Sequence, residues 1–157
     1  MASQRPALPA VEPTYDINRP FNKFIPLYAH PIPTCPGKSI VALRVEFPPN
    51  GSTPPHTHAG AFVTVNVVSG FVYNKMNDEA MEVFGPGEVF TEGPGCRHVL
   101  SDNASREEEA VIVATMVVDT RVLDEGGVMA YVVIDEVWKE AVMERIVKDA
   151  AAAGEKV

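Results

Sequence analysis

The stretch GSTPPHTHAGAFVTVNVVSG, residues 51–70, decides both the fold and the site that we expect of this chain. It places two histidines, His56 and His58, one residue apart at the start of an apolar, β-branched run. In a strand, side chains at positions i and i+2 point to the same face of the sheet. The pair would therefore aim two imidazoles at one point, a geometry that suits a divalent metal ion.

A third histidine follows about forty residues later, in the segment GEVFTEGPGCRHVLSDN, residues 87–103. Here His98 comes shortly after a turn rich in glycine and proline. If this segment pairs with the first one across a barrel, three imidazoles converge. That convergence carries most of what the sequence says about function.

These two segments resemble the paired motifs of the cupin superfamily. The first motif of that family is usually a Gly, then H-x-H, then a Glu three or four residues on, then a Gly. The position of this Glu falls at Val63, or at Phe62 with the alternative spacing, and neither residue can bind a metal. The residues that match are Gly51, His56, His58 and Gly70.

The second cupin motif is a Gly, then Pro-x-Gly, two further residues and a His. Gly87, Gly95 and His98 fit it, and Gly93 stands where proline is usual. The resemblance implies an all-β fold, a single double-stranded β-helix or jelly-roll barrel, and a metal bound by His56, His58 and His98. It also implies a broad range of chemistry, from dioxygenases, isomerases, epimerases, decarboxylases and lyases to binding and storage proteins.

The chain divides by composition into three parts of one domain. Residues 1–38 are rich in proline but contain apolar side chains, and predict an arm that lies across the barrel or across a partner's barrel. Residues 39–134 contain short runs of strand character broken by Gly and Pro, and form the predicted barrel. Within them, 107–119 predicts a central strand buried on both faces and 128–134 predicts another strand.

Residues 135–157 predict one C-terminal α-helix and a tail. Trp138, Val142 and Ile146 recur every four residues, which is the spacing of one helix face. Asp135 is a plausible N-cap for this helix.

Charge and composition limit the partners of the protein. The formal net charge of −8 and the pI near 4.9 argue against nucleic acid or anionic membranes as partners. No apolar run approaches the ~20 residues that span a bilayer, and the N-terminus has no hydrophobic segment typical of a secretory signal. With two cysteines far apart, we expect a cytoplasmic protein without a disulfide framework. The apolar arm and helix face, together with the resemblance, favour a homodimer.

The candidate site has three groups of residues. The metal ligands are the three histidines, and Fe, Zn, Ni, Mn or Co could each be the ion. Lys75 and Glu92 are candidates for a general acid or base, although both are residue types usually found on the surface. The candidate substrate pocket comprises residues that could equally be plain core packing, namely Phe62, Val63, Thr64, Asn66, Tyr73 and Phe90.

Three functions follow as hypotheses. In the leading one, three neutral ligands leave the full 2+ charge on the ion, which then assists a redox-neutral isomerisation, cyclisation, dehydration or decarboxylation of an enolisable carbonyl or phenolic substrate. The second is an Fe(II)-dependent dioxygenase with three histidine ligands. The third is a metal-free cupin that binds a small molecule.

Overall fold

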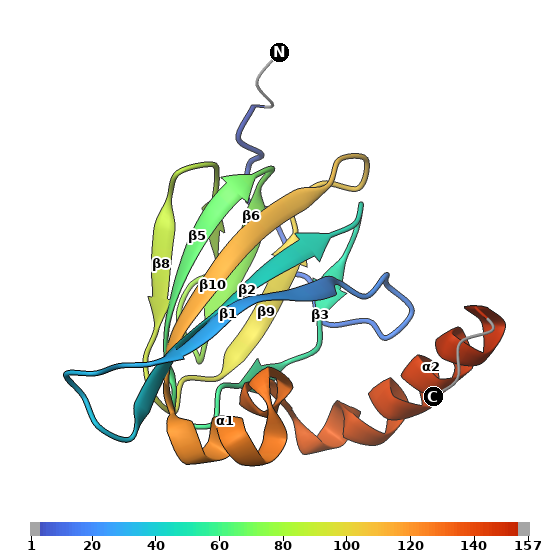
Figure 1. Ribbon diagram of the computed structural model, residues 1–157. Coiled ribbons are helices and arrows are strands. Elements are labelled where there is room, and N and C mark those ends of the chain that lie inside the picture. The colour runs from blue at the N-terminus through green and yellow to red at the C-terminus, as the bar shows by residue number, and fades with distance from the viewer. Residues whose placement is uncertain (1–3, 154–157) are drawn as a thin grey trace.

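Two sheets pack face to face in the computed structural model, which describes residues 4–153 (Figure 1). All strand pairings within them are antiparallel. The first sheet has the order β1 (Lys23–Pro31), β2 (Lys38–Phe47), β10 (Ala110–Asp119), β5 (Phe62–Ser69) and β8 (Val89–Glu92). The second has the order β11 (Val133–Ile134), β4 (His56–Thr57), β9 (His98–Asn103), β6 (Val72–Met76) and β7 (Glu82–Phe84), with β3 (Ser52–Thr53) paired to β9.

The hydrophobic core lies between the sheets and is built by strand alternation. On β5, Val63, Val65 and Val67 are buried, whereas the residues between them face outward. Strand β2 alternates in the same way and buries Val41, Leu43, Val45 and Phe47. Burying a side chain of this size stabilises a fold by about 1.5–3 kcal/mol. The predicted all-β barrel with a C-terminal helix is therefore confirmed.

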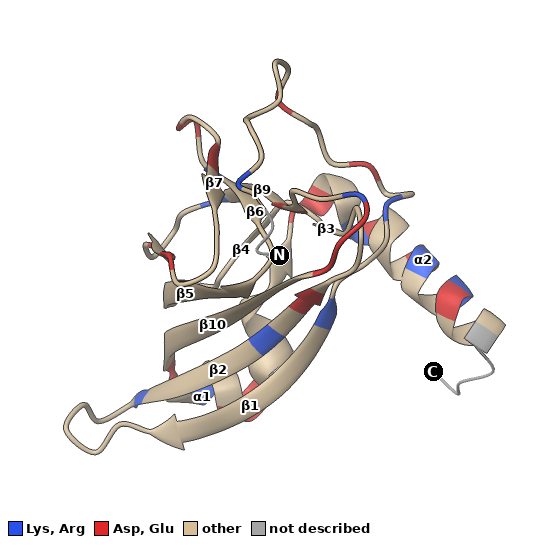
Figure 2. Cartoon of the chain, turned by 90° about the horizontal axis from the view of Figure 1, so that it is seen from above, with Lys and Arg blue, Asp and Glu red and all other residues tan. Residues whose placement is uncertain are grey.

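The predicted strand 107–119 is confirmed only in part. It begins at Ala110, and toward its end only one face is buried, because no element within residues 4–153 covers the outer face of the first sheet. Val117, for example, is 38% exposed on that face. Charged residues are sparse along β1, β2 and β10, and are more frequent in the loops and on α2 (Glu136–Ala153) (Figure 2).

The prediction of a strand over 128–134 is wrong except for its last two residues. The chain instead forms helix α1 (Thr120–Gly126) and the 3-10 helix η1 (Val128–Tyr131) before β11. The side chain of Asp119 caps α1 by accepting a hydrogen bond from the Arg121 backbone N–H. Gly127, with φ of 68°, then turns the chain between the two helices in a conformation that favours glycine.

The proline-rich N-terminal segment is only partly an arm. Its residues from Lys23 onward form β1, the edge strand of the first sheet, with an irregularity between Pro26 and Tyr28. Proline lacks a backbone N–H and is tolerated at a sheet edge for that reason. The sheet therefore starts at Lys23, sixteen residues before the expected boundary at residue 39.

The inner end of the arm is fixed by a buried ion pair. Arg19 binds the carboxylate of Asp102, which is 1% exposed and also accepts a 2.5 Å hydrogen bond from the Ser52 hydroxyl. Breaking a buried pair by removing one partner typically costs 3–5 kcal/mol. Asp102 therefore anchors the arm to the barrel.

Helix α2 packs on this same stretch of the arm and runs outward from the end of the barrel that carries α1 (Figure 1). Arg145 donates to the backbone carbonyls of Ile17 and Arg19, and its guanidinium lies 4.4 Å from the ring centroid of Phe21. Trp138 packs edge-on against Tyr15, with the ring centroids 4.9 Å apart. No helix within residues 4–153 has the length and apolar character needed to cross a bilayer.

Candidate metal centre

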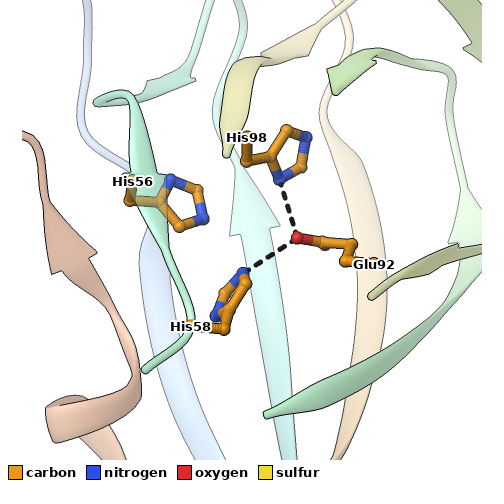
Figure 3. Close-up of side chains that lie close together, drawn as sticks. All are labelled: His56, His58, Glu92 and His98. Atoms are coloured by element: carbon orange, nitrogen blue, oxygen red, sulfur yellow. Dashed lines mark ion pairs between the residues drawn. The ribbon is translucent and has the colours of Figure 1, made fainter. Parts of the chain in front are cut away.

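Four side chains meet inside the barrel, between the two sheets (Figure 3). His56 comes from β4, His58 follows that strand directly, Glu92 ends β8 and His98 begins β9. One potential ligand atom from each of the four lies within 4.8 Å of all the others. His56, Glu92 and His98 are buried, and the side chain of His58 is 12% exposed.

The convergence of the three histidines follows from the H-x-H spacing and from the sheet register. His56 is the direct cross-strand partner of His98, and their ring centroids lie 5.1 Å apart. His58 lies on the same side as His56, at a centroid distance of 4.8 Å. The geometry that the two motifs predict is therefore present, while the role of the three residues as metal ligands stays a prediction.

Glu92 is the residue whose role the sequence did not reveal. The sequence offered it only as an acid or base, but the structure places its carboxylate against His58 and His98. Val63, where the first cupin motif usually has its Glu, is the direct cross-strand partner of Glu92. Both side chains are buried. Strand β8 thus supplies the carboxylate of Glu92 directly opposite Val63, the position at which the first motif lacks its Glu.

Main-chain carbonyls fix the tautomers of two histidines. His56 Nδ1 lies 2.7 Å from the carbonyl oxygen of Pro54, and His58 Nδ1 lies 2.7 Å from that of Tyr131. Because a carbonyl oxygen can only accept, Nδ1 must carry the proton in both rings. The lone pair of each neutral ring is then on Nε2, the nitrogen used for metal binding when Nδ1 is held in this way.

The polar atoms at the centre of the cluster are not satisfied by one another. His58 Nε2 is 3.0 Å and His98 Nδ1 is 3.4 Å from the same oxygen of Glu92. The first of these pairs is close but not oriented as a hydrogen bond, and His58 Nε2, Glu92 Oε2 and His98 Nε2 are all buried without a hydrogen-bond partner. Leaving such groups unpaired costs about 1–3 kcal/mol each. A cation between these atoms would satisfy them together.

The protonation of the cluster also suits a metal. Burial, reinforced by the neighbouring imidazoles of His98 and His58, lowers the pKa of His56 to about 3, so that its lone pair is free at neutral pH. Burial alone would raise the pKa of Glu92, but the neighbouring imidazole of His98 outweighs it and holds the pKa below its usual range. Three imidazoles and a carboxylate are a donor set that fits divalent transition metals.

The space beside the cluster, which we call the inner chamber, is small. Its volume is about 40 Å³. One water molecule needs roughly 10–15 Å³ of such space, so the chamber holds an ion and few waters but not an organic substrate. Apart from the cluster it is lined by Phe24, Leu43, Val45, Thr53, Val65, Ser101, Ile112, Ala114, Met116 and Val132.

The structure does not bring most of the predicted pocket residues to this chamber. Phe62, Thr64 and Asn66 lie on the outer face of β5, because they alternate with its buried valines. Val63 is buried in the core beside Glu92. Phe90 lies beside the cluster, edge-on to His98 at a centroid distance of 6.3 Å.

Tyr73 and Lys75 also lie outside the barrel, for the same reason of alternation along β6. The Tyr73 hydroxyl donates to the carbonyl of Ala7, at 3.4 Å, and Lys75 pairs with Glu12. Both partners belong to the N-terminal arm. Lys75 therefore cannot act as an acid or base at the cluster.

Comparison with known proteins shows which family this chain resembles. Residues 43–117 match the model of the cupin domain family. The chain is therefore similar to the cupin superfamily over its barrel, in agreement with its two motifs.

Individual relatives are distant. The chain is 28% identical over 102 residues to germin-like protein 4-1 of Oryza sativa subsp. japonica, a match that covers 59% of this chain and 40% of that protein. The chain thus spans less than half the length of this curated relative.

Solved structures show the same fold at low identity. The cupin domain of Schizosaccharomyces pombe Cnp3 superposes with a TM-score of 0.53 at 18% identity, covering 69% of this chain and 68% of that one. A cupin domain from Bordetella pertussis superposes with a TM-score of 0.51 at 20% identity, covering 64% of this chain and 97% of that one.

Proposed function

We propose that this protein is a metal-dependent enzyme that binds a divalent ion through His56, His58, Glu92 and His98 and acts on a small organic molecule. The observation that carries the proposal is the set of buried, unpaired atoms that face one another at the centre of the cluster. A metal-free binding protein would keep these atoms unsatisfied, at a cost of a few kcal/mol.

The chain's own residues hold the ion and exclude water from it. The carbonyls of Pro54 and Tyr131 orient two imidazoles, and the largely apolar chamber walls keep the local dielectric low. When bound, the ion would supply a centre that polarises a substrate oxygen and, if it is redox-active, one that activates O₂. With Glu92 as a fourth ligand, the complex carries one positive charge fewer than three histidines alone would leave.

The reaction class that the chamber supports best is oxidation with O₂, the second of the three hypotheses. Isomerisation, cyclisation or dehydration requires a side chain that moves a proton. Outside the cluster, the only polar side chains that line the chamber are Thr53 and Ser101, neither of which titrates near neutral pH. The acid or base expected at Lys75 lies outside the barrel, and Glu92 is taken up by the cluster.

Elemental analysis tests this proposal. Wild-type protein should contain nearly one equivalent of iron, either as purified or after anaerobic reconstitution. The variants His56→Ala and His98→Ala should contain little. Protein that takes up zinc or nickel but not iron would overturn the oxidation class. Protein that takes up none of the five candidate ions would overturn the metal site itself.

The homodimer stays a prediction. The uncovered outer face of the first sheet offers a surface for a second copy, because Tyr28, Phe62 and Val117 are exposed on it. Light scattering on the purified protein would give its mass in solution directly.

A further inference from the structure

A second, larger and mostly apolar cavity adjoins the metal centre, between α2, η1 and the start of β1. We call it the outer pocket. Val142, which is 2% exposed, lies at its base, and the half-exposed Met129 and Ile146 also line it. Phe21, Asn22, Ser52, Pro54 and Ile134 complete the lining together with the three residues described next.

The outer pocket and the inner chamber share part of their walls. Phe24, Thr53 and Val132 line both. The two spaces therefore adjoin, and these three residues form the wall that they share. Val132 follows Tyr131, whose carbonyl holds His58, so one short segment borders both spaces.

The size of the outer pocket sets the size of its occupant. Its volume is about 220 Å³. Sites for drug-sized ligands usually measure roughly 300–1,000 Å³, so this pocket suits a molecule of about one ring. The inner chamber, at about 40 Å³, has room for no more than a projecting oxygen beside the ion.

One polar side chain on the shared wall can donate a hydrogen bond. Asn22 is 8% exposed and donates through Nδ2 to the Thr53 hydroxyl at 2.6 Å, whereas its buried Oδ1 lies against Gly51 and does not face the pocket. The bond to Asn22 uses the Thr53 oxygen as an acceptor, which leaves the hydroxyl hydrogen of Thr53 to be donated. The pocket thus offers one donor at the shared wall.

We propose that the outer pocket binds the apolar body of the substrate, a small hydroxylated molecule of about one ring. The substrate hydroxyl accepts a hydrogen bond from the Thr53 hydroxyl and points past Thr53 toward the ion. This inference rests on the proposed function, because it takes the cluster to be the reactive centre. It adds the substrate class, which neither the family nor the cluster defines.

Binding of phenol and of toluene to the wild-type protein, measured by NMR titration, tests the pocket without an activity assay. The two molecules have nearly the same shape, and only phenol has a hydroxyl. A hydrogen bond from the Thr53 hydroxyl is worth about 0.5–1.5 kcal/mol, so phenol should bind roughly three- to tenfold more tightly than toluene. In Thr53→Val, which keeps the shape of the side chain, this preference should disappear. Equal binding of both molecules to the wild type would overturn the polar part of the inference.

A matched pair of helix variants locates the binding. Ile146→Trp fills the pocket from α2, whereas Val147→Trp adds the same bulk at the next position, which does not line the pocket. Both residues are exposed, at 42% and 47%, so both variants should fold. Phenol affinity should fall about tenfold or more, equivalent to 1.4 kcal/mol, in Ile146→Trp only. Equal affinity in the two variants would overturn the pocket assignment.

A third measurement separates this inference from the proposed function. In protein loaded with Co(II), the NMR lines of bound phenol should broaden strongly compared with the Zn(II) form. Pocket binding without this broadening, in protein that does load cobalt, would overturn the substrate role and leave the metal site intact. Conversely, phenol binding by protein that loads no metal would overturn the proposed function, and with it the substrate role.

Discussion

Lys75 and Glu92 look alike in the sequence, since each is a single charged residue in a short apolar strand, yet they end in opposite environments. Lys75 is on the outer face of β6 and pairs with Glu12 of the arm, whose side chain is 46% exposed. Glu92 faces inward from β8 and meets His58 and His98, with its own side chain 4% exposed. Exposed ion pairs contribute about 0–1 kcal/mol, whereas a buried, unpaired charge costs several. Only the inner residue therefore requires a partner such as a metal.

The largest expected effect is the gain in free energy of unfolding when a metal ion binds to the cluster that contains Glu92. At a free ion concentration of about 1,000 times Kd, binding to the folded state alone adds about 4 kcal/mol to the free energy of unfolding. For a chain of this length, that corresponds to a rise in Tm of roughly 8–16 °C, at 2–4 °C per kcal/mol. Differential scanning fluorimetry of chelator-treated protein, with and without the ion, measures it. An unchanged Tm with all five candidate ions would contradict the metal site.

A paired substitution compares the two charged residues directly. Glu92→Gln keeps the shape of the side chain but removes its charge, and should weaken metal affinity by about 100-fold or more. Replacing a residue that only supports a metal ligand costs about 10- to 100-fold, and Glu92 is itself a proposed ligand. Lys75→Gln should leave the affinity unchanged, because Lys75 pairs with the arm. Competition with a chromophoric chelator gives both values. A loss in Lys75→Gln as large as that in Glu92→Gln would contradict a direct role of the Glu92 carboxylate in metal binding.

The register of β5 and β8 permits a rescue of smaller size. Because Val63 and Glu92 are direct cross-strand partners, the double variant Val63→Glu, Glu92→Gln moves the carboxylate to the position that the cupin motif normally uses. It should recover about tenfold of the affinity lost in Glu92→Gln, or 1.4 kcal/mol.

The control for the rescue is Val67→Glu, Glu92→Gln, which adds an inward carboxylate at a position of β5 that is not the cross-strand partner of Glu92. Recovery in both double variants would mean that position 63 has no special relation to the cluster. Circular dichroism establishes that each variant is folded before its affinity is compared.

The smallest expected effect is the pH dependence of the two exposed ion pairs that hold the arm on the barrel, Lys75–Glu12 and Arg5–Glu88. The hydrogen bond to Lys75 lowers the pKa of Glu12 below its ordinary 4.5. The backbone N–H of Gly85, followed by Arg5, lowers that of Glu88 below the same value. A lowered folded pKa means that each contribution is full above 4.5 and is lost as pH falls through the folded value. The protection factors of the amides in arm residues 5–13, which correct for the intrinsic dependence of exchange on pH, should therefore fall below about pH 4.5. Protection factors that stay constant from pH 6 to pH 3 would contradict this.

The sequence predicted the parts of the site that depend on local spacing. His56 and His58 share a face because they are two residues apart, and His98 follows a turn typical of the second cupin motif. The role of Glu92 depends on which residue of β5 it pairs with, and the register between two strands cannot be predicted from a local sequence pattern. The same limit explains why Phe62, Thr64 and Asn66 were grouped with Val63 although alternation places them on the other face.

The segment after β10 shows a different limit. Residues 120–134 have no clear helical period, and the β-branched character of 128–134 suggested a strand. Signals for a short helix were nevertheless present, since Asp119 can cap a helix start and Gly126 and Gly127 can end it. The tertiary bond from the Tyr131 hydroxyl to the Asp119 carbonyl, which joins β10 to η1, has no counterpart in a sequence pattern.

Main-chain carbonyls, not side chains, orient His56 and His58, and this affects how the sequence of the protein can change during evolution. A carbonyl is present whatever side chain its residue carries, so substitutions at positions 54 and 131 need not disturb the tautomers while the backbone path is kept. Descendants of this chain could therefore exchange the side chains around the outer pocket, and with them the molecule recognised, without rebuilding the centre. Selection on such a lineage would be strict at four positions and permissive around them.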